Sequence, residues 1–410
     1  MQRSSVPMSS NRTHLLFLNA GHFADHLFML IFAKAAFTAG LAFGLAADGA
    51  YAEMLPYGIP AMVLFGACAP IAAHFADRWR RNAMMAVFFI GIGSTAIATS
   101  LAQTPLQIGI GLAAIGIFAA IYHPVGISMA IQGGGNVGWR LGVNGVWGNM
   151  GVAAAPLTTG LILSFIDWRA AFYVPGALSI LIGLVYISLI RSGRAQPAAG
   201  TAREKAHVSF AHGWQRALIA LALVTAAGGF VFGAMTFLVP RLFEVRMTGI
   251  TADIALTGAL AAAVYAVAAF AQLIVGRIID RRRVKPVLIT VALAQPLLLA
   301  IMAQQVDYAL FAAALLAMAF VFGQIPITDA VLARYVPDQW RTKVLSIKFL
   351  LNLVIGALSI MTARWVLADN GSFETVMTIV AIASGLVMVS ALILPSRSGA
   401  EIEPVAAPAE

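Results

Sequence analysis

The first long apolar segment of the sequence contains ionisable residues whose types and spacing suit proton transfer. It includes the stretch NAGHFADHLFMLIFAK, residues 19–34. On a helix, His22, Asp25 and His26 fall within one arc of about 100°, with Asn19 close beside it. A carboxyl group next to an imidazole in a medium of low dielectric constant can exchange a proton near neutral pH. We therefore predict that Asp25 is a proton site and that the two histidines assist it.

Other roles for this polar face are compatible with the same spacing. An intramembrane histidine is as often a hydrogen-bonded packing residue, and this applies to His26. His22 and His26 lie four residues apart and could begin a metal site, but such a site needs further ligands. Lys34 lies off the shared face, near the end of the segment, where its ammonium group could extend to water. We expect no bound metal and no cofactor, with the proton as the coupling ion.

The composition requires that most of the chain lies in a lipid bilayer. Of 410 residues, 60% are hydrophobic and only 10% are charged, against about 25% charged in soluble proteins. A membrane-spanning helix needs about 20 mostly apolar residues. We therefore predict an all-α integral membrane protein with twelve transmembrane helices. The apolar runs lie near 15–40, 52–76, 83–102, 106–131, 142–166, 170–190, 214–240, 251–278, 285–304, 308–333, 344–367 and 373–394.

The positive charge of the chain is explained by membrane topology. The net charge is +9, and with the N-terminus inside, most of the 26 Lys and Arg fall on cytoplasmic segments. This is the positive-inside distribution of a multi-pass protein. We expect a bacterial inner-membrane location with both termini in the cytoplasm, a lipid environment and a small-molecule substrate. We expect no nucleic-acid partner and a monomer.

Paired landmarks indicate that the chain is two related halves. Three kinds of landmark recur at nearly one spacing, about 200 residues. They are Asp77 and Asp280, each followed by arginines, the Trp-Arg pairs at 139–140 and 340–341, and Pro124 and Pro326. Parallel repeats with a substrate site at mid-depth between them are a recurrent transporter design. We predict six-helix bundles at 1–190 and 214–396 around a central cavity, a cytoplasmic linker at 191–213 and a tail at 397–410.

Two short basic loops carry a possible gating motif. The stretch AHFADRWRR contains Asp77, Arg78 and Arg81, and GRIIDRRRVK contains Asp280 and Arg281. Such charges can cap a helix end and exchange ion-pair partners as two bundles move. Both stretches resemble the loop signature of the major facilitator superfamily. The resemblance extends over the twelve helices, the duplication and the central linker, and it implies a secondary transporter with alternating access. The sequence contains no nucleophile paired with a base and no nucleotide-binding loop, so no motif in it indicates an enzyme.

The fifth apolar run is similar to the antiporter signature of facilitator exporters. Gly142, Gly151, Pro156 and Gly160 match that signature, and the proline could bend the helix where the halves hinge. In the fourth run, His123 precedes Pro124. This His-Pro pair, together with the histidines and acid of the first run, resembles the fosmidomycin resistance branch of the superfamily. These resemblances imply proton-coupled drug export, with His123 as a further proton-coupling candidate.

Polar residues in other apolar runs are candidates for lining the cavity. Asp329 and Lys348 lie at similar depth on adjacent helices, so an ion pair is expected, since an unpaired intramembrane charge is costly. That pair could be structural or functional. Basic groups in the cavity would suit a substrate with a negative or polar group. The cavity candidates are Asn19, Asn144, Asn149, Gln324, Asp329, Lys348 and Asn352.

Three functions are compatible with this pattern. The first is efflux of a small organic compound, anionic or antibiotic-like, in exchange for protons. The second is proton-coupled uptake of an organic acid or another nutrient by the same fold. The third is a membrane receptor that transports nothing, which would need no charges in the cavity. We expect the first of these.

Overall fold

Helices form the framework of the molecule. The computed structural model describes residues 8–132, 137–195, 210–369 and 371–396, and within them the regular structure is helical with no strand. Twelve helical segments are long and apolar enough to cross a membrane. The predicted all-α architecture with twelve spans is therefore confirmed. Most of the predicted linker and the whole predicted tail lie outside the described residues.

The first six spans come from ten helical elements. They are α1 (Met8–Ala42), α2 (Ala50–Met54), the 3₁₀ turn η1 (Leu55–Gly58), α3 (Ile59–Ala67), α4 (Ala69–Arg78), α5 (Arg81–Ser100), α6 (Pro105–Ala119), α7 (Tyr122–Gln132), α8 (Val137–Phe165) and α9 (Ala170–Arg191).

The second six spans come from seven helices. They are α10 (Trp214–Arg246), α11 (Ile254–Arg281), α12 (Val284–Gln304), α13 (Asp307–Tyr335), α14 (Asp338–Ala368), α15 (Phe373–Ser384) and α16 (Leu386–Ile393).

Proline explains where the fourth span is broken. Helix α6 ends at Ala119 and α7 begins at Tyr122, because Pro124 has no N–H to continue the hydrogen-bond ladder. Tyr122 and His123 therefore stand in the first turn of a new helix. Pro326, the matching proline of the second half, lies inside the continuous helix α13. The two halves thus differ at this landmark.

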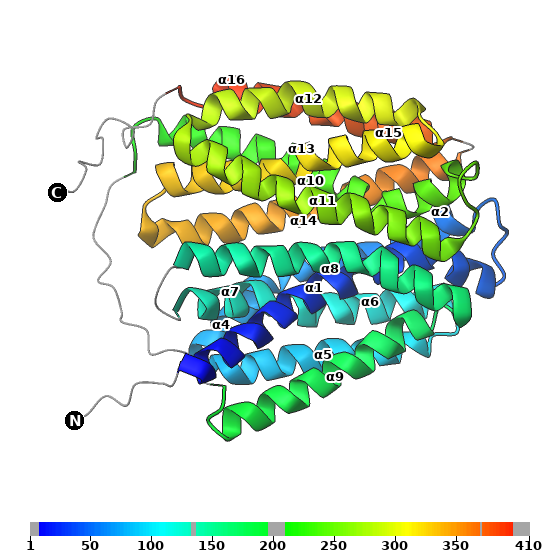
Figure 1. The fold of residues 1–410 in the computed structure, drawn as a ribbon, viewed down its shortest axis with the longest axis horizontal. Coiled ribbons are helices and arrows are strands. Elements are labelled where there is room, and N and C mark those ends of the chain that lie inside the picture. Colours follow the sequence, from blue (N-terminus) through cyan, green and yellow to red (C-terminus); the bar gives the residue numbers. More distant parts are fainter. Residues whose placement is uncertain (1–7, 133–136, 196–209, 370, 397–410) are drawn as a thin grey trace.

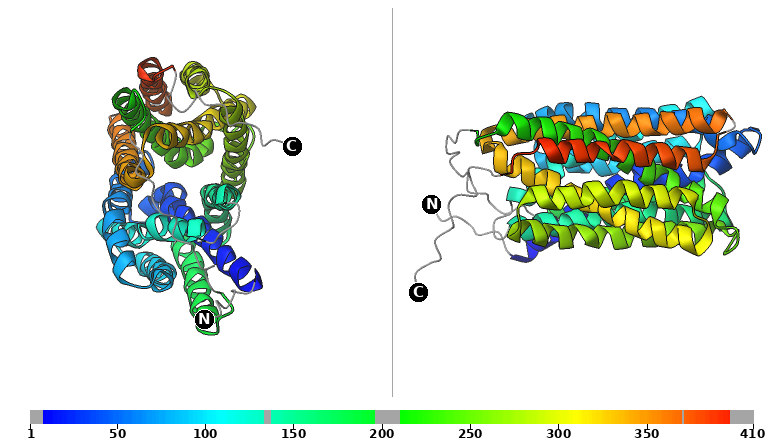
Figure 2. Two further views of the ribbon diagram at one scale, coloured as in Figure 1. Left: turned by 90° about the vertical axis from the view of Figure 1, so that its left-hand side faces the viewer. Right: turned by 90° about the horizontal axis from the view of Figure 1, so that it is seen from above.

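The helices gather into two groups that run along the long axis of the molecule. Figure 1 shows α1 and α4–α9 below α10–α16, with α2 beside the second group at one end, and the end-on view of Figure 2 shows the two groups next to each other. Across the interface, α8 packs against α11, and α14 packs against α3. We name the end that carries Arg78 and Arg281 the basic end. The other end, with the turns at 43–49 and 247–253, is the opposite end.

Glycines on α8 and α11 show that the halves touch at the opposite end and separate towards the basic end. A β-carbon at Gly160 of α8 would lie 2.8 Å from the Ile254 carbonyl oxygen, and one at Gly258 of α11 would overlap the Pro156 carbonyl. Gly142 and Gly276 lie on the same helix faces, about five turns away. A β-carbon at either of these meets nothing within 4 Å. The structure is therefore open at the basic end.

Alanine at Gly258 is expected to destabilise the protein, whereas alanine at Gly276 is not. The first substitution forces a methyl group against backbone, which cannot move aside, at an expected cost of about 1–3 kcal/mol. The second gains helix propensity of up to about 1 kcal/mol without a clash. Thermal unfolding of the two purified variants measures the difference. Equal midpoints would contradict the close α8–α11 contact.

Candidate functional site

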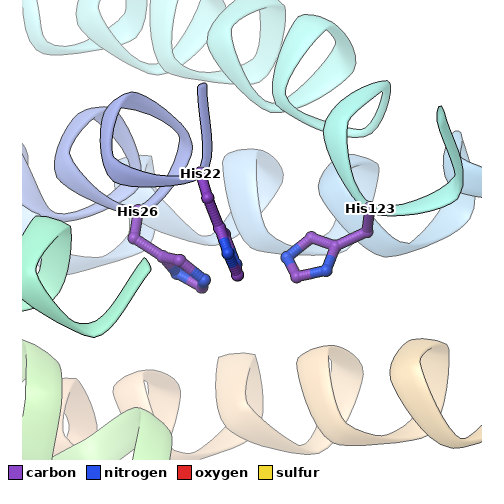
Figure 3. Close-up of side chains that lie close together, drawn as sticks. All are labelled: His22, His26 and His123. Carbon is purple, nitrogen blue, oxygen red and sulfur yellow. The ribbon is translucent and has the colours of Figure 1, made fainter. Parts of the chain in front are cut away.

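Three histidines converge beside the interface between the halves. Figure 3 shows His22 and His26 on α1 and His123 on α7, with their rings pointing into one space. The ring centroids of His22 and His26 are 5.0 Å apart, and those of His22 and His123 are 5.3 Å apart. His26 and His123 are 5.6 Å apart. Because the fourth span is broken, His123 at the start of α7 lies beside the predicted polar face of α1.

A hydrogen-bond network orients His22. Its Nδ1 donates to the Asn144 carbonyl of α8 at 2.8 Å. The Asn144 amide donates to Tyr122 Oη at 2.8 Å and to Asn19 Oδ1 at 3.0 Å. Tyr122 in turn donates to the Leu18 carbonyl at 2.7 Å, and its ring stacks on that of His22. With the proton on Nδ1, the Nε2 lone pair of His22 faces away from the network.

Asp25 is fully buried beside this cluster. Its exposed fraction is 0%, and neither carboxylate oxygen has a hydrogen-bond partner among the described residues. Its nearest ionisable neighbour is His123, whose Nε2 lies 3.4 Å from Asp25 Oδ2. Burying a carboxylate without full compensation costs several kcal/mol. A group kept at that cost is a candidate for function, and His123 is the residue placed to exchange a proton with it.

Glycines of α8 make room for the α1 cluster. A β-carbon at Gly148 would lie 2.6 Å from His22 Nε2, and one at Gly151 would overlap the Phe23 carbonyl. Gly151 and Gly160 of the predicted hinge are therefore packing contacts, and Gly142 lies against open space. Pro156 stays inside the continuous helix α8. The role of these four residues as a hinge stays a prediction.

The second half contributes an ion pair near the same region. Lys348 Nζ lies 2.5 Å from Asp329 Oδ1, with side chains 15% and 56% exposed. Phe349, the next residue on α14, packs against His123 with ring centroids 4.6 Å apart. The pair considered from the sequence is thus present, and α14 brings it towards the histidine cluster.

The remaining predicted cavity residues have different surroundings. Gln324 is 5% exposed and donates to the Val224 carbonyl at 3.0 Å, so its amide nitrogen is used within the second half. Asn352 backs onto Gly229 of α10, and Asn149 is partly buried. The structure brings Asn19 and Asn144 into the histidine network. It does not bring Gln324 there.

The predicted gating residues lie at the basic end. Arg78, Asp280 and Arg281 are exposed, and no salt bridge joins them to one another in the described part of the chain. Arg81 is partly buried at the start of α5, and the side chain of Asp77 lies outside the described residues. Their gating role stays a prediction.

The sequence-based prediction that Lys34 extends to water is wrong. Its side chain does not extend to water but is 2% exposed, with Nζ 2.5 Å from Glu244 Oε1 and donating to Thr257 Oγ1 at 2.9 Å. Glu244 also pairs with Arg241 at 2.7 Å. Lys34 belongs to the first half and its partners to the second. A buried ion pair therefore joins the two halves at the opposite end.

Several of these residues were missed from the sequence. Glu244 lies beyond the seventh apolar run of the sequence, 214–240, whereas α10 continues to Arg246. The rule that singled out Asp25, an acid within an apolar helix, would have found it on a longer run. Tyr122 and Phe349 adjoin predicted residues, but their ring contacts depend on packing between helices and have no local pattern.

The fold and the site together define a class of protein. Two helical groups meet at one end through a buried ion pair and separate at the other, with ionisable side chains beside their interface. This is the architecture of a membrane transporter. The chain belongs to the Major Facilitator Superfamily, whose family model matches residues 23–324 and 246–409. It is accordingly a multi-pass membrane transporter and not an enzyme.

Solved structures with a similar fold are also transporters. One is a bacterial homolog of the human lysosomal transporter Spinster, in an inward-facing and unoccupied conformation. It has a TM-score of 0.74 and 15% identity, and the match covers 94% of this chain and 98% of that one. Another is the inward-open xylose transporter of E. coli, with a TM-score of 0.74, 12% identity and coverage of 95% and 97%. At these identities the likeness concerns the fold alone.

Similarity to curated proteins is confined to parts of their sequences. The puromycin resistance protein of Streptomyces alboniger is 30% identical over 124 residues, which is 29% of this chain and 25% of that protein. A probable hexose phosphate transport protein of Chlamydia pneumoniae is 49% identical over 43 residues, 10% of each. The chain thus spans a quarter or less of these relatives.

Proposed function

We propose that this transporter exports a small organic compound from the cytoplasm in exchange for protons. The bacterial inner membrane is its proposed location, and it acts as a monomer. The basic end faces the cytoplasm, in keeping with the positive-inside rule, so both termini are cytoplasmic. The structure then represents the state in which an exporter loads its substrate.

The observation that carries this proposal is the combination of open and closed ends. The α8 and α11 faces diverge at Gly142 and Gly276, while the Lys34–Glu244 pair joins the halves at the opposite end. In the proposed cycle a compound approaches from the basic end, and its release at the opposite end requires that the ion pair separates. A transport cycle of this kind needs both states to be accessible.

Proton coupling is assigned to the buried acid. Asp25 lies on α1 beside the interface between the halves and contacts His123, and it pairs with no cation of fixed charge among the described residues. Among described groups, the ionisable neighbours that face this region are His22, His26 and Tyr122, from α1 and α7. In each cycle this carboxyl would be protonated from the outside and deprotonated towards the cytoplasm.

The charges near the site favour a substrate with a negative or polar group. Lys348 and the three imidazoles are basic, and the Asp329 partner of Lys348 is more than half exposed. Export of antibiotic-like compounds is supported by the resemblance to the fosmidomycin resistance branch and by the partial similarity to a puromycin resistance protein.

Direction and coupling are testable in everted membrane vesicles. A thermal-shift screen of the purified protein with organic anions, fosmidomycin and puromycin selects a bound compound. Vesicles with the protein, energised to be acid inside, are expected to accumulate that compound, and a protonophore is expected to abolish accumulation. Vesicles from cells without the protein are the control. Accumulation by right-side-out vesicles alone would contradict export and support uptake.

A further inference from the structure

The three imidazoles described above form a cluster that the proposed export cycle does not require in full. Each of His22, His26 and His123 offers one ring nitrogen, and these nitrogens all lie within 4.8 Å of one another. The His22 and His123 rings are nearly perpendicular, at 89°. Three imidazole nitrogens this close together match the composition of a metal-ligand set.

Packing alone does not account for three histidines at this place. The Nε2 atoms of His22 and His123 are buried and have no hydrogen-bond partner among the described residues. An unpaired buried polar atom costs about 1–3 kcal/mol. Apolar side chains in place of the histidines would pack equally well against the surrounding rings of Phe65, Phe349 and Tyr122. A bound species that accepts these lone pairs would remove the cost.

We propose that His22, His26 and His123 bind a divalent transition-metal ion of the Zn²⁺, Co²⁺ or Ni²⁺ type. Imidazole is a preferred ligand of these ions, whereas Mg²⁺ and Ca²⁺ prefer oxygen. Zinc–nitrogen bonds of about 2.0–2.1 Å place tetrahedral ligand atoms about 3.3 Å apart. The three ring nitrogens lie within 4.8 Å of one another, so rotation of the side chains must shorten these distances when the ion binds. Three protein ligands leave a fourth position for water or a substrate group.

The surroundings of the cluster support metal binding. The Asn144 carbonyl accepts from His22 Nδ1, which holds Nε2 in the unprotonated form that coordinates a metal. Asp25 Oδ2, 3.4 Å from His123 Nε2, places a carboxyl group beside the ion. The hydrogen bonds of this network join α1, α7 and α8, so they orient His22 without the help of a bound ion.

The proposed metal site lies entirely within the first half and is accessible to an ion. All three ligands come from α1 and α7, within the first half, so movement of the second half need not break the site. His26 and His123 are partly exposed, the latter by 20% of its side chain, which provides a route for the ion. The site goes beyond the proposed export of an organic compound and stands whether or not that proposal holds.

Cobalt binding to the purified full-length protein tests the site. The affinity tag is removed, bound metal is stripped with a chelator, and Co²⁺ is added, because four-coordinate Co²⁺ absorbs visible light far more strongly than the aqueous ion. We expect one Co²⁺ per chain with an intense visible spectrum, bleached by one equivalent of Zn²⁺ and unaffected by Mg²⁺. His26→Gln and His123→Gln should each weaken binding about tenfold or more.

The matched control is His74→Gln, which changes an exposed histidine of α4 and should bind Co²⁺ like the wild type. Size-exclusion profiles and thermal unfolding identify any variant that fails to fold. His26 is partly exposed, so its variant decides the question if the His123 variant does not fold. Unchanged Co²⁺ binding in the folded His26→Gln variant, or a wild-type spectrum of aqueous Co²⁺ only, would overturn the proposal.

Discussion

Replacing Asp25 with asparagine is expected to reduce proton-driven transport strongly without lowering thermal stability. The wild-type carboxyl is fully buried without a hydrogen bond in the described structure, so its neutral isostere removes a desolvation cost and leaves the packing unchanged. Coupling free energies of about 1–3 kcal/mol correspond to losses of about 5–150-fold in proton-driven accumulation. Transport of the compound selected by the thermal-shift screen, in proteoliposomes with and without a pH gradient, measures this loss.

Two controls separate coupling from structure in the Asp25 experiment. Asp25→Glu keeps an ionisable group and should retain part of the proton-driven accumulation. Asp48→Asn changes an exposed acid in the turn after α1 and should behave like the wild type. Energy-independent exchange of substrate should survive in Asp25→Asn. Full proton-driven transport by that variant would remove Asp25 from the coupling role, and a large fall in its unfolding midpoint would make Asp25 a structural residue.

Replacing Glu244 with glutamine is expected to cause the largest loss of stability among single changes at the interface. Glu244 faces both Lys34 and Arg241, at 2.5 and 2.7 Å, and the Lys34 side chain is fully buried. The substitution leaves two cations close together without a counter-charge. Removing one partner of a buried pair costs about 3–5 kcal/mol. Thermal unfolding of the variant in detergent measures this loss against the wild type.

The order of the single and double variants identifies the cause. Lys34→Met should cost less than Glu244→Gln, because Arg241 still neutralises the glutamate. Adding Lys34→Met to Glu244→Gln should restore part of the stability, because it removes a buried unpaired cation. Glu374→Gln is the matched control: its pair with Arg246 spans 3.8 Å at a site 47% exposed, where a change of at most about 1 kcal/mol is expected. Equal losses in both glutamine variants would contradict a special role of the buried pair.

The parts of the fold that follow from local chain properties were predictable. Twelve spans follow from the length of apolar runs, since a bilayer requires about 20 residues per helix. The polar face of α1 follows from the helical period, which places His22, Asp25 and His26 together without any knowledge of neighbours. The break before Pro124 follows from its missing N–H, yet Pro326 in the matching place leaves α13 continuous. Packing against neighbouring helices decides whether a proline ends a helix or only removes one hydrogen bond from it.

The sequence by itself determined that this protein crosses a membrane with twelve helices and carries an acid and histidines inside the first of them. Only the tertiary structure decided that His123 joins His22 and His26, that Asn144 and Tyr122 orient the cluster, and that Lys34 pairs with Glu244. It also decided which end is open. These are relations between helices distant in the chain, and they depend on how each helix is rotated and packed against the others. Hydrophobic period and residue spacing report on one helix at a time and carry no information about that rotation.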